Sequence, residues 1–410
     1  MKKINLFTNN IDLVNFFFFS YILSYIAGPA IINIYLTFFS LFCIFFFYKN
    51  NKTLHLILKD RSFILLTIFI IYIFLKDIFL YKFNLEILSF LRIYLIFSFI
   101  CFYSLLNPKK IELKFIYISI ILFILNLDSI YQYIFKFNII GYQIFDQYRL
   151  TSFFENEPII GSFIMKLFFP LLLFFYCQEK KDIFTISVLI LSVIVIFISG
   201  ERMPFLQLIF GISIIFLFLY QSLKKKLLFL LSIFFLISSI FIINPSAFDR
   251  YKDTYDGLNS LYKDIKDNKT IKSEIISKHG IYDYYQNFST AISLWKKNYF
   301  LGNGYRYYKN NCKNDLKLEY SWGCSTHPHN IYLEILSDYG LIGLSLYILF
   351  IINLLYNFLK SKSDKRYYGL ILTVIVTSVP FVTSQSIFSS YYGSIYFLYI
   401  FLLRYYSNFK

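Results

Sequence analysis

The sequence predicts an all-α integral membrane protein that crosses the bilayer about twelve times. Of its 410 residues, 58% are hydrophobic and only 16% are charged, whereas soluble globular proteins contain about 25% charged residues. The apolar residues occur in runs of about 20, the length that a helix needs to cross a hydrocarbon core about 30 Å thick. These observations exclude an ordinary soluble domain.

The apolar runs define the expected spans and their connections. We expect spans near residues 13–28, 31–48, 62–81, 86–106, 111–128, 159–177, 182–199, 203–220, 227–243, 336–358, 367–386 and 388–404. Only Gly28-Pro29 separates the first two, as a turn signal inside an otherwise continuous apolar run. The alternative is one kinked helix over both runs, which would invert every later span.

The distribution of Lys and Arg favours twelve spans with both termini in the cytoplasm. With the N-terminus inside, every cytoplasmic segment except the tail from Arg404 contains two or more Lys or Arg within a few residues, and that tail contains Arg404 and Lys410. The short opposite connections carry few or none, which is the positive-inside pattern. We therefore attribute the net charge of +16 to orientation rather than to nucleic acid binding. No small-residue cleavage site is apparent, so the first span is expected to be an uncleaved signal.

Two polar segments fall on the outer side of the membrane, at about residues 128–158 and 244–338. Long connections without apolar runs are often functional. We divide the chain into spans 1–9 over residues 1–243, one large loop over 244–335, periplasmic in a Gram-negative cell, and spans 10–12 with a cytoplasmic tail over 336–410.

The cysteines agree with this topology. Cys43, Cys101 and Cys177 lie in or at the ends of spans, where cysteine acts as a small apolar residue. Cys312 and Cys324 lie twelve positions apart in the long loop, which faces an oxidising compartment. We expect a disulfide between them, with free thiols as the alternative.

Arginines close to the outer membrane surface are candidates for function, because a charge near the bilayer is costly. Arg149 precedes the sixth span, Arg202 lies in the tight connection SGERMPF, and Arg306 follows a turn in the long loop. A guanidinium offers a planar, permanently charged fork that suits phosphate. The alternatives are a snorkelling anchor for Arg202, a salt bridge from Arg149 to Glu155 or Glu157, and a solvated position for Arg306.

Two of the four histidines, His327 and His329, close the long loop before the tenth expected span. With Cys312 and Cys324 they make a nominal zinc set, but the cysteines form no close Cys-x-x-Cys pair and an oxidising compartment favours the disulfide. We expect no metal. A structural alternative for His329 is to cap the following helix, a place that Asn330 could equally take.

His329-Asn330, nine further residues and Gly340-Leu341-Ile342-Gly343 resemble the His-Asn-x9-Gly-x-x-Gly signature of the bacterial O-antigen ligase and polymerase superfamily. Its place, at the end of a long outer loop and the start of the tenth of twelve spans, is also similar. The stretch SGERMPF resembles that family's Ser/Thr-Gly-x-Arg step, LGNGYRYY its Gly-x-Gly turn, and RLTSFFENEPIIGS its Arg-Leu-Thr segment. The resemblance covers the whole topology and is strongest from Arg149 to Gly343.

The resemblance implies a metal-independent glycosyltransferase of the bacterial inner membrane that uses no cofactor. Its donor is a glycan on undecaprenyl pyrophosphate, carried on the periplasmic leaflet. Ligases move that glycan onto the lipid A–core oligosaccharide, and polymerases move it onto another lipid-linked repeat unit. The match to the histidine motif favours ligation slightly.

The resemblance also gives the candidate residues roles. Arginines aimed at the leaving pyrophosphate would stabilise the charge that develops when its bond to sugar C1 breaks. A neutral imidazole would accept the proton of the attacking hydroxyl. We expect Arg202 and Arg149 to clamp the pyrophosphate and His329 to be the base. The residues expected to bind substrate are Arg306, His327, Asn330, Arg250 and His279.

One stretch departs from the family pattern. The family usually has a further arginine shortly before the Gly-x-Gly turn, and the matching stretch here, KHGIYDYYQNFSTAISLW, has none. Lys278 or His279 could substitute, or Arg250 could reach in from further upstream. The full membership of the clamp is therefore open.

Two other classes of function compete with the enzyme. A transporter would carry ionisable residues near the bilayer midplane and pseudo-symmetric halves. The mid-span positions here are nearly all apolar, with Arg92 and Lys166 as exceptions, which disfavours transport. A structural scaffold of a cell-envelope assembly would leave the histidine motif without a task.

Overall fold

The fold is almost entirely helical, as the sequence predicts. The computed structural model describes residues 13–79, 86–107, 111–145, 149–179, 182–219, 224, 231, 245–266, 281–315, 325–361, 364–380 and 385–407. Within these ranges the only β-structure is two isolated bridges, one of which pairs Phe145 with Arg149. The all-α prediction is therefore confirmed.

Most of the helices follow the apolar runs of the sequence. In chain order, the helices are α1 (Leu13–Ile26), α2 (Pro29–Lys49), η1 (Asn51–Lys59), α3 (Arg61–Phe79), α4 (Ile87–Leu106), α5 (Phe115–Phe135), α6 (Ile160–Cys177), α7 (Ile183–Ile198), α8 (Arg202–Leu219), α10 (Pro245–Lys266), α12 (Ile281–Trp295), α13 (Tyr307–Asp315), α14 (Ile331–Lys360), η3 (Lys365–Tyr367), α15 (Tyr368–Thr377) and α16 (Tyr392–Tyr406). Of these, α10, α12 and α13 lie in the polar segment before the tenth expected span. Within the described ranges, six of the helices, α2 to α6 and α14, are long and apolar enough to cross a membrane. Shorter apolar helices are α1, α7 and α8. The chain is a multi-pass membrane protein.

The first two apolar runs form two helices rather than one kinked helix. Gly28 separates them with φ of +104°, a conformation that glycine adopts without steric cost, and Pro29 then starts α2. The two helices fold back on each other, since the Phe17 ring lies 4.5 Å from the Phe39 ring. The turn signal at Gly28-Pro29 therefore acts as a true helix boundary.

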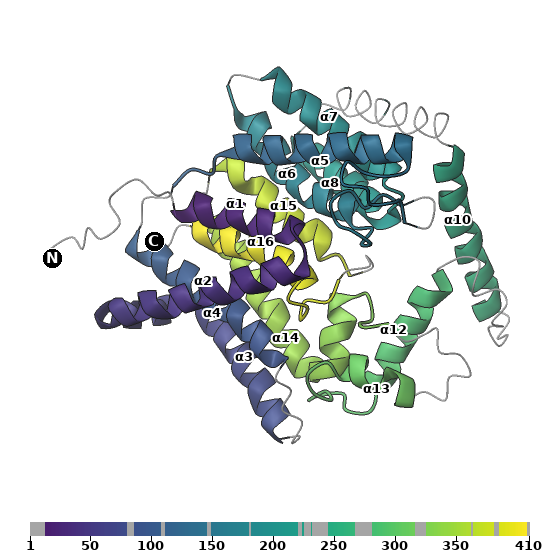
Figure 1. Ribbon diagram of the computed structural model, residues 1–410. Helices are drawn as coiled ribbons and strands as arrows, with labels where there is room; N and C mark the ends of the chain where they lie inside the picture. Colours follow the sequence, from purple (N-terminus) through teal and green to yellow (C-terminus); the bar gives the residue numbers. More distant parts are fainter. Residues whose placement is uncertain are drawn as a thin grey trace.

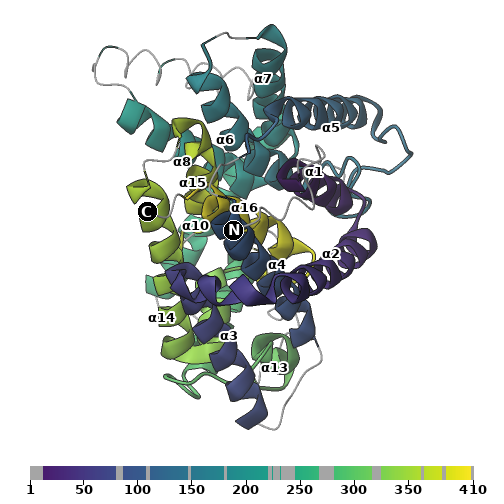
Figure 2. The ribbon, with the colours of Figure 1, turned by 90° about the vertical axis from the view of Figure 1, so that its left-hand side faces the viewer.

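The helices form two groups that meet at α15 and α16 (Figure 1). In one group, α6 packs against α5, α7, α8 and α15. In the other, α4 packs against α2 and α16, and α14 packs against α3. Because α16 contacts α15, α14 and α4, the C-terminal helix lies at the centre of the bundle (Figure 2).

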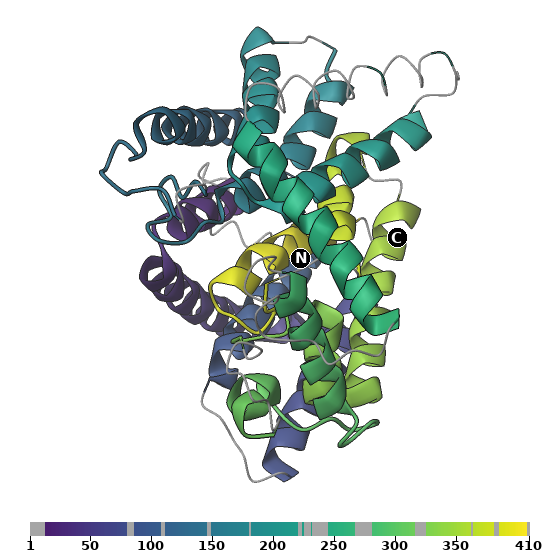
Figure 3. The same ribbon diagram turned by 90° about the vertical axis from the view of Figure 1, so that its right-hand side faces the viewer.

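The segment between α8 and α14 also contains helices where it is described. There α10 runs across the face seen in Figure 3 and contacts α12, which packs on α14. The next helix, α13, also contacts α12 and α14. These helices therefore cover one end of α14, which itself starts at Ile331, five residues before the expected start of the tenth span.

A buried ion pair fixes the C-terminal helix to the start of α3. Arg404, counted in the sequence with the cytoplasmic tail, lies inside α16 and donates to Asp60 at 2.5 Å, and both side chains are completely buried. Arg404 also contacts Ser104 Oγ at 3.3 Å, and Asp60 accepts from the Ser62 N–H at 2.9 Å. The pair joins three helices in a region where a lone charge is costly.

We expect Asp60→Asn to lower the free energy of unfolding by about 3–5 kcal/mol, because it leaves the buried Arg404 charge uncompensated. The measurement is thermal unfolding of the purified protein in detergent. Asp364→Asn is the matched control, because its pair with Arg366 is exposed and exposed pairs contribute about 0–1 kcal/mol. Equal effects of the two substitutions would contradict the assignment.

Candidate active site

Two glycines from different parts of the chain meet where no side chain fits. Gly302 has φ of +71° and Gly340, inside α14, has φ of +63°. A Cβ built on Gly302 would lie 2.4 Å from the Asp338 carbonyl oxygen, and one on Gly340 would lie 2.4 Å from the Phe300 carbonyl oxygen. The Gly-x-Gly turn and the first glycine of the Gly-x-x-Gly motif are therefore two sides of one contact, which we call the glycine interlock.

Backbone hydrogen bonds close this contact. The N–H groups of Asn303 and Gly304 both donate to the Asp338 carbonyl, at 2.8 and 2.7 Å, and the Leu341 N–H donates to the Tyr299 carbonyl at 3.0 Å. Gly340 interrupts the helical conformation of α14, so its neighbours need such partners outside the helix. The turn thus replaces the helical hydrogen bonds that the kink removes.

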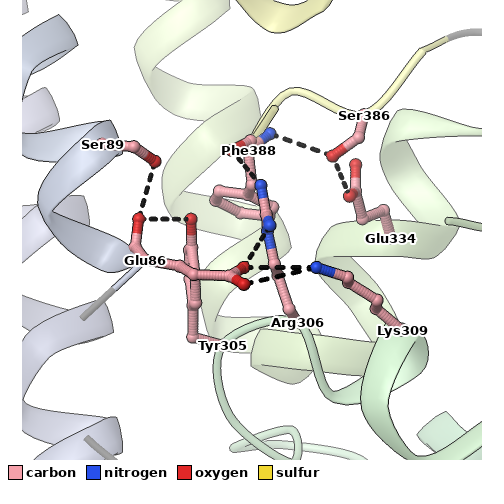
Figure 4. A network of polar contacts seen from close by, with 8 residues as sticks. All are labelled: Glu86, Ser89, Tyr305, Arg306, Lys309, Glu334, Ser386 and Phe388. Carbon is pink, nitrogen blue, oxygen red and sulfur yellow. Dashed lines mark hydrogen bonds and ion pairs between the residues drawn. The ribbon is translucent and has the colours of Figure 1, made fainter. Parts of the chain in front are cut away.

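Arg306 follows the glycine interlock in the chain, and its guanidinium already has bonding partners within the protein (Figure 4). It has φ of +52°, and its Nη2 donates to the Phe388 carbonyl at 2.9 Å. Its Nη1 forms an ion pair with Glu86 at the start of α4, and Lys309 lies 3.4 Å from the same carboxylate. One carboxylate therefore faces two cations, and the cluster keeps one net positive charge.

The electrostatic balance of this cluster appears in the Glu86 carboxyl group. Partial burial alone would raise its pKa, but the charges of Arg306 and Lys309 hold that pKa below its ordinary value. Glu86 is therefore ionised at neutral pH. A phosphate that binds Arg306 must compete with this carboxylate.

His329 ends the loop before α14 in a left-handed backbone conformation, with φ of +53°. Its ring centroid lies 4.3 Å from that of His327 and 5.5 Å from the Tyr284 ring of α12, edge to face. Burial lowers the pKa of the His329 imidazole because it penalises the charged form. The ring is therefore neutral at pH 7, the state in which it can accept a proton.

Asn330, and not His329, caps α14. Its side-chain oxygen accepts from the N–H groups of Tyr332 and Leu333 at 3.0 and 3.1 Å, as an N-cap does. Its side-chain nitrogen donates to the Pro380 carbonyl. Both ends of the amide serve the structure, and substrate binding by Asn330 stays a prediction.

His327 is buried and is held by the loop and by α12. Its Nδ1 lies 3.1 Å from Thr326 Oγ1, and its carbonyl accepts from Ser325 Oγ. Ser325 also contacts the side-chain oxygen of Asn287 at 3.3 Å, which accepts from the Tyr308 hydroxyl at 2.8 Å. Asn287 thereby joins α12 and α13 to the histidine loop, a role that the sequence analysis missed.

Glu334 is a second residue of the site that no sequence motif indicates. It lies one turn after the Asn330 cap and is buried, and its carboxylate accepts from Ser386 Oγ and, at 3.2 Å, from the Ile387 N–H. The next carbonyl, of Phe388, is the one that Arg306 contacts. Glu334 and Arg306 therefore hold the connection before α16 from two sides (Figure 4).

A second cluster lies where α7 turns into α8. The Leu150 N–H donates to the Ser199 carbonyl at 3.1 Å, which brings Arg149 next to this turn. The Arg149 guanidinium lies over the Phe145 ring at 4.5 Å, and its charge favours the ionised form of Glu201. The structure thus brings together the two arginine segments that the sequence assigned to the clamp.

Glu201 joins this turn to the start of α6. It accepts from the Gly161 N–H at 2.6 Å, and a Cβ on Gly161 would lie 2.4 Å from Ser199 Oγ. Burial raises the pKa of Glu201 to about 7, although the Gly161 N–H and the charge of Lys166 oppose the shift. The next residue, Arg202, starts α8, and its buried Nε has no hydrogen-bond partner within the described ranges.

The α15–α16 connection links the two clusters. Tyr391 stacks on Tyr25 with ring centroids 4.5 Å apart, and Tyr25 stacks on Phe163 of α6 at 5.4 Å. Glu157 forms a hydrogen bond with Tyr392. Since Ser386 to Phe388 hold Glu334 and Arg306, one connection touches both halves of the site.

Helix N-termini converge on this region. Glu86 precedes α4, Gly161 lies at the start of α6, Arg202 starts α8, and Asn330 caps α14. A helix N-terminus carries a partial positive charge that favours anions, and the first N–H groups of α6 and α14 are already bound by Glu201 and Asn330. Together with the arginines, this arrangement suits an anionic group such as a pyrophosphate.

Four other residues named in the sequence predictions lie partly or wholly outside the described residues. Arg250 lies in α10, but its side chain is outside the described part, as are His279, Lys278 and Cys324. Cys312 is disulfide-bonded, and its pairing with Cys324 stays a prediction. The described residues contain no group of three or more His, Cys, Asp and Glu side chains that could hold a metal ion.

Comparison with known proteins supports the resemblance seen in the sequence. Residues 187–348 match a family model described as O-antigen ligase. The matched range contains Arg202, Arg306, His329 and the glycine interlock, and Arg149 precedes it. No curated protein is similar enough to the chain to count as a match.

We expect Gly340→Ala to destabilise the protein and to abolish its activity, because the new methyl group would overlap the backbone at Phe300. The measurements are the thermal midpoint in detergent and glycan transfer. Gly141→Ala is the matched control: Gly141 also has positive φ, but no atom lies within 4 Å of the place that a new methyl group would take there, so only backbone strain of about 1–2 kcal/mol is added. Similar losses in both variants would show that strain, and not the interlock, is responsible.

Proposed function

Because residues 187–348 match a family model described as O-antigen ligase, we propose that the chain moves a glycan from undecaprenyl pyrophosphate to an acceptor hydroxyl in the periplasm. The proposed reaction needs no metal or cofactor. The acceptor is the lipid A–core oligosaccharide. Polymerisation onto another lipid-linked repeat unit is the alternative within the same superfamily.

One observation carries this proposal. The glycine interlock joins the turn before Arg306 to the helix that follows His329, so two motifs of the family match form a single structural unit. Such a unit positions a neutral imidazole and a cationic cluster relative to each other. A base near a site for anions is what transfer from a pyrophosphate donor requires.

The proposed membrane arrangement adds further spans to the six candidate spans. It has twelve spans in the bacterial inner membrane, both termini in the cytoplasm, and residues 244–335 as the periplasmic catalytic region between spans 1–9 (1–243) and spans 10–12 (336–410). The convergence of the α4, α6, α8 and α14 N-termini supports it, because helices that begin at one end of a bundle enter the membrane from the same side. The clusters then lie on the periplasmic face.

The proposed reaction breaks one bond and forms one. The acceptor hydroxyl attacks sugar C1 and its proton passes to the neutral His329 imidazole, while the bond from C1 to the pyrophosphate oxygen breaks. Arg202 and Arg149 stabilise the negative charge that the leaving undecaprenyl pyrophosphate acquires. His327, Arg306, Asn330, Arg250 and His279 are proposed to contact substrate, and a Cys312–Cys324 disulfide to brace the loop.

A surface-glycan gel from a strain that lacks this gene tests the function. Bare lipid A–core with accumulated lipid-linked polymer would identify a ligase, and lipid A–core with a single repeat unit would identify a polymerase. We expect His329→Ala to reproduce the deletion at unchanged membrane level, since a general base contributes about 10²–10⁴-fold. The control His55→Ala changes an exposed histidine and should restore the glycan. An unchanged glycan profile in the deletion strain would refute the proposal.

The pH dependence of transfer should report the His329 imidazole. Burial lowers its pKa below the ordinary value of about 6.5, and the base acts in its neutral form. Protonation of His329 should therefore not change the transfer rate near pH 7. The rate should fall only as the pH drops through a midpoint below about 6.5. Initial rates across pH 5 to 8 would measure it. Glu201→Gln removes the group whose pKa is about 7, and an acid limb that disappears in this variant would belong to Glu201 instead.

Arg202→Lys should reduce the turnover rate by about 10²–10³-fold, because a point charge does not reproduce the guanidinium fork at the leaving group. The assay is transfer from purified lipid-linked donor in vesicles at saturating substrate. Arg61→Lys makes the same chemical change at an exposed position at the start of α3 and should be active. Near-normal turnover of Arg202→Lys would show that Arg202 acts only as a membrane anchor.

A further inference from the structure

The turn before Gly302 exposes apolar side chains, although it lies in the polar segment between α8 and α14. Phe300 is 67% exposed, and its neighbours Tyr299 and Leu301 are also exposed. Contiguous exposed apolar residues in a protein indicate an interaction surface. The contacts of this turn show which surface it belongs to.

The turn is held against the side of α3. The Tyr72 hydroxyl donates to the carbonyls of Leu301 and Tyr339, at 2.9 and 3.0 Å. Tyr72 lies seven residues before the end of α3 at Phe79, which corresponds to about 10 Å along the helix axis. Figures 1 and 2 show α3 and α13 at the same end of the molecule. The turn therefore lies alongside the membrane-crossing helix and not beyond its end.

The turn also continues the apolar surfaces of the two helices beside it. Ile78 and Phe79 of α3 are exposed, as is Ile342 of α14, whose N–H donates to the Phe300 carbonyl at 3.1 Å. Further along α14, Ile352 is exposed as well. Both helices are candidate membrane spans, so their exposed apolar faces contact lipid tails. Phe300 adjoins this surface at Ile342.

The residues before the turn are those of a membrane–water boundary. Trp295 Nε1 donates to the Tyr299 carbonyl at 2.9 Å, and the two rings lie 5.0 Å apart. Trp and Tyr concentrate at headgroup level, with their polar atoms toward water. Lys296 and Lys297 between them are exposed. Along the chain, the lysines are therefore followed by the aromatic Tyr299 and then by the purely apolar Phe300 and Leu301.

We infer that residues 299–301 form a hook inserted among the lipid acyl chains of the leaflet at this end of α3 and α14. Bilayer lipid is the occupant because the hook joins two lipid-facing helix surfaces. Since Gly302 follows directly and enters the glycine interlock, the hook sets the depth of Arg306 and His329 relative to the hydrocarbon. Under the proposed function, that depth is the headgroup level, where the pyrophosphate of a lipid-linked donor lies.

Spin-label accessibility tests the hook without any assay of activity. The full-length protein carries Cys177→Ser to remove the exposed free cysteine, and is labelled without reductant so that the Cys312 disulfide stays intact. Nitroxides are placed by Phe300→Cys, by Ile352→Cys as the lipid reference and by Asn310→Cys, exposed on α13, as the water reference. The vesicles contain phosphatidylethanolamine and phosphatidylglycerol. Oxygen concentrates in lipid, and the nickel chelate Ni-EDDA stays in water.

We expect the label at Phe300 to collide several-fold more often with oxygen than with Ni-EDDA, as at Ile352, and the ratio to reverse at Asn310. A Phe300 label that behaves like the Asn310 label would overturn the hook. Protection from both reagents would also overturn it, because protein and not lipid would then cover the turn. Leu301→Cys gives the same test if Phe300→Cys does not elute as a monodisperse protein. Failure here leaves the proposed transfer reaction standing, since that reaction is tested separately by the glycan gel.

Discussion

The close approach of two backbones at Gly302 and Gly340 determines the geometry of the candidate site. The contact needs positive φ at both residues and leaves no room for a Cβ at either, so only glycine satisfies both conditions. It fixes where α14 kinks, and the kink fixes the direction of the turn that carries His329. On the other side, the same contact determines where Arg306 leaves the turn. Two glycines without any reactive group therefore control the relative positions of the groups that have one.

The polar contacts around the interlock explain how the site tolerates charge near a bilayer. Glu86 balances Arg306 and Lys309, and Glu201 accepts from the N–H groups at the start of α6 and interacts with the charges of Lys166 and Arg149. Each carboxylate lies at a helix N-terminus, where a negative charge is stabilised. Counted over Arg306, Lys309 and Glu86, the first cluster keeps one net positive charge.

Local patterns in the sequence predicted the membrane class, the boundary at Gly28-Pro29 and the segments that hold Arg202 and His329. Those features depend on hydropathy, turn residues and motifs, which are read along the chain. The partner of Arg306 was not predictable, because Glu86 is 220 positions away and sits alone between two apolar runs. Asn287 escaped notice for a related reason: one amide in an aromatic-rich helix is ordinary until a second segment packs against it.

The two arginines on the α8 and α13 sides differ in what they already bind. Both terminal nitrogens of Arg306 have partners, in Glu86 and the Phe388 carbonyl, so at least two of its five N–H donors are already used. The Nε of Arg202 is buried and has no hydrogen-bond partner in the part of the chain described, and a buried donor without a partner is costly. A bound pyrophosphate oxygen would remove that cost at Arg202. This difference favours Arg202 over Arg306 for the proposed pyrophosphate clamp, while Arg306 also holds the α15–α16 connection through the Phe388 carbonyl.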